Sequence, residues 1–216
     1  YKTEGIPFAA AIFTNFTQDH LDFFKDMEEY KKAKLRLFAQ NPPPVCVLNG
    51  DDGVGREIGA LCEKQGVRTV FYGLNTPVEA FAIVTDESLH GTECMLNIND
   101  ELCRISLSMT GRHNVYNALA AAACAMELGV ATQAIADGLS ALSGVEGRLQ
   151  RVGVCNGGEI YVDFAHTPDG LANSLDALKI HCRGRLICLF GCGGNRDKSK
   201  RPIMGETAAK KADFCI

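Results

Sequence analysis

Apolar runs early in the chain predict buried strands joined by helices. A run over residues 9–16 is typical of a buried strand, and Asp26 can cap a following helix in which apolar residues recur near every 3.6 positions. Short apolar runs over residues 45–50 and 67–73 predict two more strands, and residues 51–66 between them predict a turn and a helix. A β-α-β arrangement of this kind favours a parallel sheet.

The pattern changes to alternation of apolar and polar residues between Ala80 and Met109. Gly, Asn and Asp divide this stretch into three runs, which predict a small antiparallel meander attached to the parallel core. An alanine-rich run over residues 111–130 then predicts a long helix that ends at Gly129, and residues 131–142 predict another.

Glycines over residues 144–153 predict a domain boundary, which divides the chain into residues 1–144 and 145–216. A second α/β unit follows. Its expected elements are a strand and loop over residues 157–166, a helix over 167–182 with Pro168 near its first turn, a strand over 185–194 and a helix over 202–212. The predicted fold class is therefore α/β.

Composition narrows the class of protein. The 216 residues are 46% hydrophobic and 22% charged, with a net charge of -4, which is ordinary for a globular protein and gives no basic field for nucleic acid or an anionic membrane. No signal peptide or long apolar run is present. Ten cysteines occur singly without a CxxC pair, which favours reduced thiols in a cytoplasm over disulfides or structural zinc.

A histidine and a lysine stand out in the stretch over residues 14–38. His20 lies in an acidic turn, and its imidazole can bind a divalent ion. Lys34 follows one predicted helix later, and a lysine forced neutral by its neighbours can capture carbon dioxide as a carbamate, which is a carboxylate on a long arm. The alternative for Lys34 is a solvated residue on an exposed helix face.

The string GRHNVYN places His113, Asn114 and Asn117 at the entrance of the alanine-rich helix. An asparagine side chain offers both a donor and an acceptor, as the edge of adenine requires. The alternative for Asn114 is helix capping, whereas Asn117 lies too far into the helix to cap it.

Three further candidates follow the predicted domain boundary. Arg148 lies at the hinge, where it could reach terminal phosphates once the domains close; otherwise it is a surface arginine beside glycines. Asp163 ends a predicted strand, where a carboxylate could accept ribose hydroxyls or instead cap the next helix, and His166 lies in the loop beyond.

A glycine-rich loop, GCGGNRDKSKRP, carries Arg196 and several other charged residues. Arginine can grip a carboxylate with two parallel bonds, so this loop suits a carboxylate-bearing substrate, although it could be a solvated basic loop. The glycines at Gly50, Gly53 and Gly55 have the wrong order for a dinucleotide loop and predict only strand-turn-helix packing.

These strings, in this order over nearly the whole chain, resemble the Mur ligases, and within them the enzymes that add the third amino acid to UDP-N-acetylmuramoyl-dipeptide. The resemblance implies a parallel-sheet, ATPase-like central domain with a small antiparallel meander, followed by the start of a Rossmann-like C-terminal domain. It also implies roles for the candidates: a Mg²⁺ site at His20 and carbamylated Lys34, adenine contacts at His113, Asn114 and Asn117, phosphate binding at Arg148, ribose binding at Asp163, a place beside the nucleotide for His166, and substrate binding at Arg196.

The implied activity is ATP-dependent amide formation. The γ-phosphoryl group of ATP passes to the carboxylate of UDP-N-acetylmuramoyl-L-alanyl-D-glutamate, and the amine of a diamino acid then attacks the acyl phosphate. The loop resembles the branch that adds meso-diaminopimelate, with lysine as the alternative. We expect a cytoplasmic monomer.

The phosphate-cradling G-K-[ST] loop of the family does not occur in this sequence, which also lacks an initiator Met and stops at a segment typical of a strand. We therefore expect a fragment that is inactive by itself. Two alternatives remain: a non-catalytic nucleotide-binding remnant, and a ligase similar to folylpolyglutamate synthetase.

Overall fold

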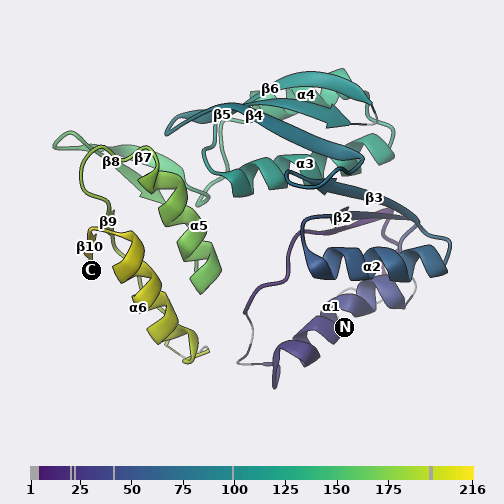
Figure 1. Ribbon diagram of the computed structural model, residues 1–216, viewed down its shortest axis with the longest axis horizontal. Coiled ribbons are helices and arrows are strands. Elements are labelled where there is room, and N and C mark those ends of the chain that lie inside the picture. Colours follow the sequence, from purple (N-terminus) through teal and green to yellow (C-terminus); the bar gives the residue numbers. More distant parts are fainter. Residues whose placement is uncertain (1–4, 20, 22, 41, 99, 195–196) are drawn as a thin grey trace.

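The computed structural model contains two groups of elements that lie side by side (Figure 1). The first group is built on a six-stranded sheet, and the second on a hairpin and a short β-α-β unit. The structure describes residues 5–19, 21, 23–40, 42–98, 100–194 and 197–216.

The first group confirms the predicted α/β class. Its strands lie in the order β1-β2-β3-β4-β5-β6; the pairs from β1 to β4 are parallel and those from β4 to β6 are antiparallel. The predicted meander therefore extends the parallel sheet and is not a separate layer. The elements are β1 (Ala10–Phe13), α1 (Met27–Ala39), β2 (Val45–Asn49), α2 (Gly53–Lys64), β3 (Arg68–Gly73), β4 (Ala80–Ser88), β5 (Gly91–Ile98), β6 (Glu101–Leu107), α3 (Arg112–Glu127) and α4 (Thr132–Ala141).

Helices cover both faces of the parallel strands, which explains their continuous apolar runs. Along β2, Cys46 and Leu48 belong to the core that includes α2, whereas Val47 belongs to the core that includes α3. All three residues are completely buried. This division follows from the alternation of side chains along a strand.

The ends of the helices follow the expected local chemistry. The side chain of Asp26 caps α1 by accepting a hydrogen bond from the backbone of Glu29, as predicted. At the carboxyl end of α3, Gly129 adopts a φ of 85°, and the backbone N–H of Val130 donates a hydrogen bond to the carbonyl oxygen of Ala125. A residue in the left-handed region is the usual stop for a helix, so the predicted end at Gly129 is confirmed.

The second group contains β7 (Gln150–Cys155), β8 (Gly158–Val162), α5 (Pro168–Lys179), β9 (Ile187–Cys188), α6 (Lys200–Lys211) and β10 (Phe214–Cys215). Parallel pairing of β9 with β10 across α6 forms a β-α-β unit. Residues 185–194 were expected to be a strand with a glycine-rich exit; the strand is shorter than the apolar run, because pairing with β10 covers only Ile187 and Cys188. The strand before Asp163 belongs to an antiparallel hairpin with β7, so in the described part of the chain it does not end at the edge of a parallel sheet.

None of the helices in the described part of the chain is both long enough and apolar enough to cross a membrane.

Candidate functional site

The first turns of α3 place two of the predicted nucleotide residues on one face. His113 is half-buried and Asn117 is exposed one helical turn further on. Gly111 precedes the helix with a φ of 95°, and a Cβ at this position would lie 2.6 Å from Cε1 of His113. A glycine is therefore required for the His113 ring to fold back over the start of the helix.

Asn114 faces the opposite way and is only 2% exposed. Its amide nitrogen donates a hydrogen bond of 2.8 Å to the carbonyl oxygen of Thr110. The alternative that Asn114 caps the helix is wrong, because the cap residue is Gly111 and no side chain caps it. Burial also keeps Asn114 away from the surface on which Asn117 lies.

The segment that joins the two groups is held by Asp163. One carboxylate oxygen accepts a hydrogen bond of 2.8 Å from the backbone N–H of Leu149, and the other accepts one of 2.8 Å from that of Ala165. Leu149 is 6% exposed and has a φ of 43°, a conformation unfavourable for a leucine. The alternative that Asp163 caps α5 is wrong, since the capping side chain is that of Thr167.

Arg148 lies next to this carboxylate and contacts an exposed aromatic ring. Its guanidinium carbon is 5.9 Å from the centroid of Phe164, which is 68% exposed. An arginine above a ring keeps its donors available for an anion while its orientation is restricted.

Three of the predicted residues meet electrostatically at the start of α3. Burial lowers the pKa of His113, and the positive charge of Arg148 lowers it further, whereas the negative charges of Asp163 and Glu87 oppose the shift. The imidazole is therefore neutral near pH 7, with one nitrogen able to donate and one able to accept. The structure thus brings His113, Arg148 and Asp163 together across the junction of the two groups.

A carboxylate in the turn between β2 and α2, that of Asp51, fixes α3 in place. Asp51 Oδ2 accepts hydrogen bonds from the backbone N–H of Leu74 at 2.7 Å, from that of Asn75 at 3.0 Å and from the Tyr116 hydroxyl at 2.7 Å. Asp51 Oδ1 accepts one of 2.6 Å from the Thr76 hydroxyl. Burial alone would raise the pKa of Asp51, but these hydrogen bonds together lower it. Because Tyr116 lies beside Asn117, this network orients the exposed face of α3.

Lys34 lies on the inward face of α1. It follows Tyr30 and precedes Phe38 by four residues each, and both aromatic residues are buried. Its ammonium nitrogen is 5.2 Å from the centroid of the Tyr30 ring. The lysine is half-buried, whereas Lys32 on the same helix is exposed. Its position argues against the alternative of a fully solvated face residue.

This position fits a carbamate that helps to hold Mg²⁺, because an amine on an apolar, aromatic surface is less hydrated than an ordinary surface lysine. His20, the other predicted ligand, lies outside the described residues. Within the described ranges, no group of three or more His, Cys, Asp or Glu side chains is arranged to hold a metal ion. A site here would therefore depend on the modified lysine and on residues such as His20.

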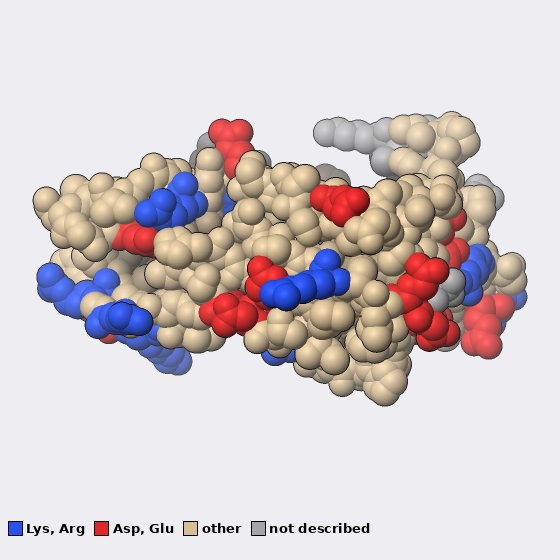
Figure 2. All heavy atoms as spheres, turned by 90° about the horizontal axis from the view of Figure 1, so that it is seen from above, with Lys and Arg blue, Asp and Glu red and all other residues tan. Residues whose placement is uncertain are grey.

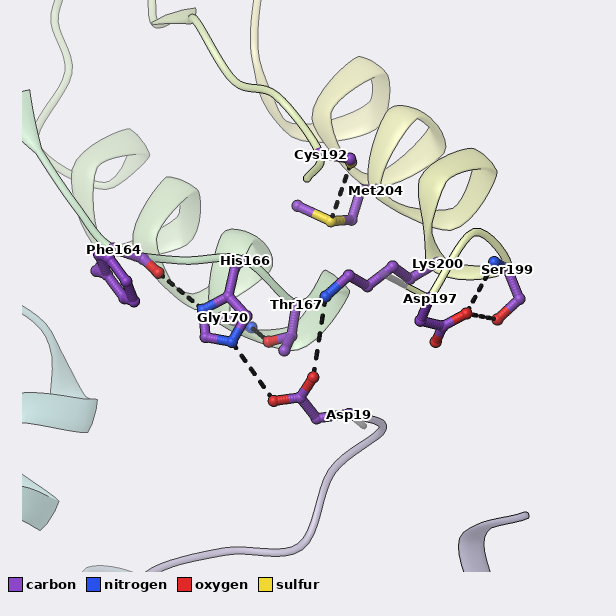
Figure 3. A network of polar contacts seen from close by, with 10 residues as sticks. All are labelled: Asp19, Phe164, His166, Thr167, Gly170, Cys192, Asp197, Ser199, Lys200 and Met204. Carbon is purple, nitrogen blue, oxygen red and sulfur yellow. Dashed lines mark hydrogen bonds and ion pairs between the residues drawn. The ribbon is translucent and has the colours of Figure 1, made fainter. Parts of the chain in front are cut away.

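The loop after β1 meets the second group of elements through Asp19 (Figure 3). One carboxylate oxygen lies 3.4 Å from His166 Nε2, and the other lies 3.8 Å from Lys200 Nζ. His166 Nδ1 lies 3.0 Å from the Phe164 carbonyl oxygen, and must carry a hydrogen to bond to it. An ion pair between His166 and Asp19 therefore requires the doubly protonated imidazolium.

Two cations at the start of α6, just after the glycine-rich loop, are not simply solvated. The Arg201 guanidinium donates to the carbonyl oxygens of Gly193 at 3.2 Å and Gly194 at 2.6 Å, and Lys200 is 5% exposed. These two cations point inward, and Lys198 is exposed. Arg196 lies outside the described residues.

A cavity of about 360 Å³ opens between the β4–β5 turn and the junction of the two groups. Arg148 lines it together with Thr110 and Tyr161. Among the described residues, Arg148 is the one predicted nucleotide residue in its lining; Asn117, Asp163 and His166 are not among the lining residues. The face in Figure 2 carries acidic and basic groups side by side, with the basic ones more frequent toward the end formed by the second group.

Family models match nearly the whole chain. The model for the Mur ligase middle domain matches residues 1–125, and the model for the Mur ligase glutamate ligase domain matches residues 147–216. The chain belongs to the Mur ligase family. The predicted resemblance is thus confirmed.

Individual relatives agree with the family. A UDP-N-acetylmuramoyl-L-alanyl-D-glutamate--2,6-diaminopimelate ligase from Caldanaerobacter subterraneus is 40% identical over 216 residues, which are 100% of this chain and 44% of the relative. A solved structure of a ligase of the same name has a TM-score of 0.73 and 31% identity, over 99% of this chain and 44% of that one. MurF from Acinetobacter baumannii has a similar fold, with a TM-score of 0.83 and 21% identity over 97% of this chain and 46% of that one. The chain therefore spans less than half the length of these relatives.

Sequence reasoning missed two residues of this Mur ligase chain that the structure places beside the predicted ones. Asp19 directly precedes His20, and Lys200 stands at the start of α6 among other basic residues. Neither has a local pattern that distinguishes it from a surface charge. Only the burial of Lys200 and its approach to Asp19 reveal the pair.

Proposed function

We propose that this chain is part of a cytoplasmic, ATP-dependent ligase of peptidoglycan precursor synthesis. The reaction is addition of meso-diaminopimelate to UDP-N-acetylmuramoyl-L-alanyl-D-glutamate through an acyl phosphate. The observation that carries the proposal is that models of the Mur ligase middle domain and glutamate ligase domain match consecutive parts of the chain. The 40% identity to a relative named for this reaction supports the choice of substrates.

Residues 1–144 form the central ATP-binding domain in this proposal, and residues 145–216 form the start of the domain that binds the amino acid. The separate apolar cores of the two groups support the division. The ligase acts as a monomer, away from nucleic acid and membranes.

The nucleoside of ATP lies along α3. Exposed Asn117 offers a donor and an acceptor to the adenine edge, and neutral His113 lies one turn before it. Each oxygen of Asp163 has a lone pair left after its backbone hydrogen bond, so the carboxylate can also accept ribose hydroxyls. His166 lies in the loop that follows.

Arg148 binds the phosphates in this scheme. A guanidinium that is oriented by Phe164 loses little freedom when it meets the transferring group, where negative charge is spread over several oxygens. Arg196 holds a carboxylate of the diamino acid, and its amine then attacks the acyl phosphate. The residues of this chain contribute orientation and charge, so their effect is on the rate of chemistry as well as on binding.

Carbamylated Lys34 and His20 would hold Mg²⁺ in this proposal. When bound, the ion neutralises charge on the phosphates. The half-buried place of Lys34 between Tyr30 and Phe38 supports this role, because packing on both sides restricts where a carbamate formed on the side chain can lie.

The test uses the full-length protein that carries this chain. We expect it to release phosphate from ATP only when both the muramoyl dipeptide and a diamino acid are present, with meso-diaminopimelate preferred to lysine. Turnover with a folate and glutamate instead would favour a folylpolyglutamate ligase. Nucleotide binding without any turnover would favour the non-catalytic remnant.

A lysine substitution tests the carbamate separately. Lys34→Ala should lower kcat by at least about a hundredfold, since it removes one anionic ligand of the ion. Formate or acetate should restore part of the activity by supplying a carboxylate. Lys32→Ala on the exposed face of the same helix is the matched control and should change kcat less than twofold. Loss of activity with no rescue would contradict the carbamate.

A further inference from the structure

The glycine-rich loop before α6 and the loop after β1 belong to different groups of elements, and the buried cation Lys200 lies between them. The first loop, residues 191–199, leads into α6, and the second, residues 14–19 and beyond, follows β1. Lys200 extends from the start of α6 toward Asp19, as Figure 3 shows.

Burial makes the position of Lys200 unusual. Its side chain is 6% exposed, although lysine is rarely buried without a charged partner because its ammonium is strongly hydrated. The distance from Lys200 Nζ to Asp19 Oδ1 is 3.8 Å, which is an ion pair and not a direct hydrogen bond.

A second carboxylate, Asp197, lies in the turn from which Lys200 extends. Asp197 is 8% exposed and accepts hydrogen bonds from the hydroxyl and the backbone N–H of Ser199. The Ser199 hydroxyl is the main cause of the lowered pKa of Asp197, and the charge of Lys200 contributes to it. Asp197 therefore shapes the turn at the start of α6, and the Lys200 side chain extends from this turn to an acid on the opposite loop.

We propose that Lys200 is a positioning residue that couples the glycine-rich loop to the loop after β1 through its ion pair with Asp19. The contact itself depends only on the observed geometry. Its meaning for catalysis rests on the proposed function, in which Arg196 holds the amine substrate and His20 helps to hold Mg²⁺. By fixing one loop against the other, Lys200 sets the distance between the attacking amine and the acyl phosphate.

The contact is tested first on the 216-residue chain by hydrogen exchange, without any nucleotide or substrate. Lys200→Met removes the charge and keeps a long unbranched side chain, and it should speed amide exchange in residues 14–26 by about tenfold. Asp19→Asn should have a similar effect. Exchange in the β7–β8 hairpin, residues 150–162, should stay unchanged.

The double variant separates a direct pair from two independent effects. If Lys200 and Asp19 act through each other, the variant with both changes should exchange no faster in residues 14–26 than the faster single variant. Lys210→Met is the matched control, because Lys210 lies on the same helix, is 71% exposed and pairs at the surface with Glu206. It should leave exchange in residues 14–26 unchanged.

Unchanged exchange in that loop in both single variants would overturn the proposal, as would single effects that multiply in the double variant. If Lys200→Met does not fold, as far-UV circular dichroism would show, Lys200→Gln decides, because Asp19→Asn also changes the contact of Asp19 with His166. Because these measurements need no turnover, they stand even if the ligase assignment fails.

The catalytic consequence is tested in the full-length ligase. Lys200→Met should lower kcat by about tenfold and leave the KM for ATP within twofold, because a misplaced amine slows attack and does not weaken nucleotide binding. Lys200→Arg, which keeps the charge, should recover part of the kcat. A loss confined to the KM for ATP, or no recovery with arginine, would contradict the positioning role.

Discussion

Removal of the Asp51 carboxylate tests whether one acid fixes α3. Asp51→Ala leaves four donors without their acceptor: the backbone N–H groups of Leu74 and Asn75 and the hydroxyls of Thr76 and Tyr116. Asn75 is exposed, so water can replace its lost bond. The other three donors lie in part-buried surroundings.

The magnitude follows from these three bonds. Each contributes about 1 kcal/mol net, so Asp51→Ala should lower the free energy of unfolding by about 3 kcal/mol. Tyr116→Phe removes one of these bonds, together with an exposed bond from the Asn75 side chain that water can replace, and should cost about 1 kcal/mol. Because that bond is already lost in Asp51→Ala, the double variant should be no less stable than Asp51→Ala, which corresponds to a coupling energy of about 1 kcal/mol.

The assay is urea unfolding of the chain followed by far-UV circular dichroism, with the four proteins measured at one pH. The effect should also depend on acid. The folded-state pKa of Asp51 is lowered from 3.8, so its carboxylate stabilises the fold above that pH, and the contribution is lost as pH falls through the folded-state pKa. The difference between wild type and Asp51→Ala should therefore shrink in strong acid.

Two results would refute the reasoning. A change of less than about 0.5 kcal/mol in Asp51→Ala would mean that water replaces all four bonds, as at an ordinary surface position. Fully additive effects of the two substitutions would mean that Tyr116 is held by contacts other than Asp51.

Two further predictions concern packing and pH. Gly55→Ala should destabilise the chain by about 3 kcal/mol in urea unfolding, because the new Cβ would lie 2.1 Å from the backbone oxygen of Asn49. Gly53→Ala is the control: open space surrounds this position, so the substitution should be neutral or stabilising. Equal effects of the two substitutions would contradict the clash. Burial lowers the pKa of His113 from 6.5, so the unfolded chain binds a proton that the folded chain does not, and the free energy of unfolding should fall as pH drops below 6.5. His113→Gln should flatten this part of the pH profile. An unchanged profile would contradict a buried neutral imidazole.

Local signals in the sequence were sufficient for most of the elements. Asp26 begins α1 and Gly129 ends α3 by the same backbone chemistry that predicted them, and Pro168 occupies the first position of α5. Strand length was less predictable. The apolar run around Cys188 satisfies a strand pattern over many residues, but pairing with β10 limits it to two.

Side-chain roles that depend on distant partners could not be predicted. Asn114 and Asn117 are the same residue type three positions apart, and only the packing of α3 on the sheet decides that one is buried and the other exposed. Asp51 binds Tyr116 across 65 positions of sequence, and Lys200 meets Asp19 from another group of elements. No local pattern encodes such contacts, because they arise only when the chain has folded.

The backbone of Leu149, in the segment that joins the two groups, is strained. A leucine in the left-handed region carries a cost of about 1 kcal/mol, and here the bond from its N–H to Asp163 holds it there. Loss of the hydrogen bond to Asp163 would let Leu149 leave the left-handed region. The side chain that is proposed to bind ribose therefore also holds the backbone of the segment that joins the two groups.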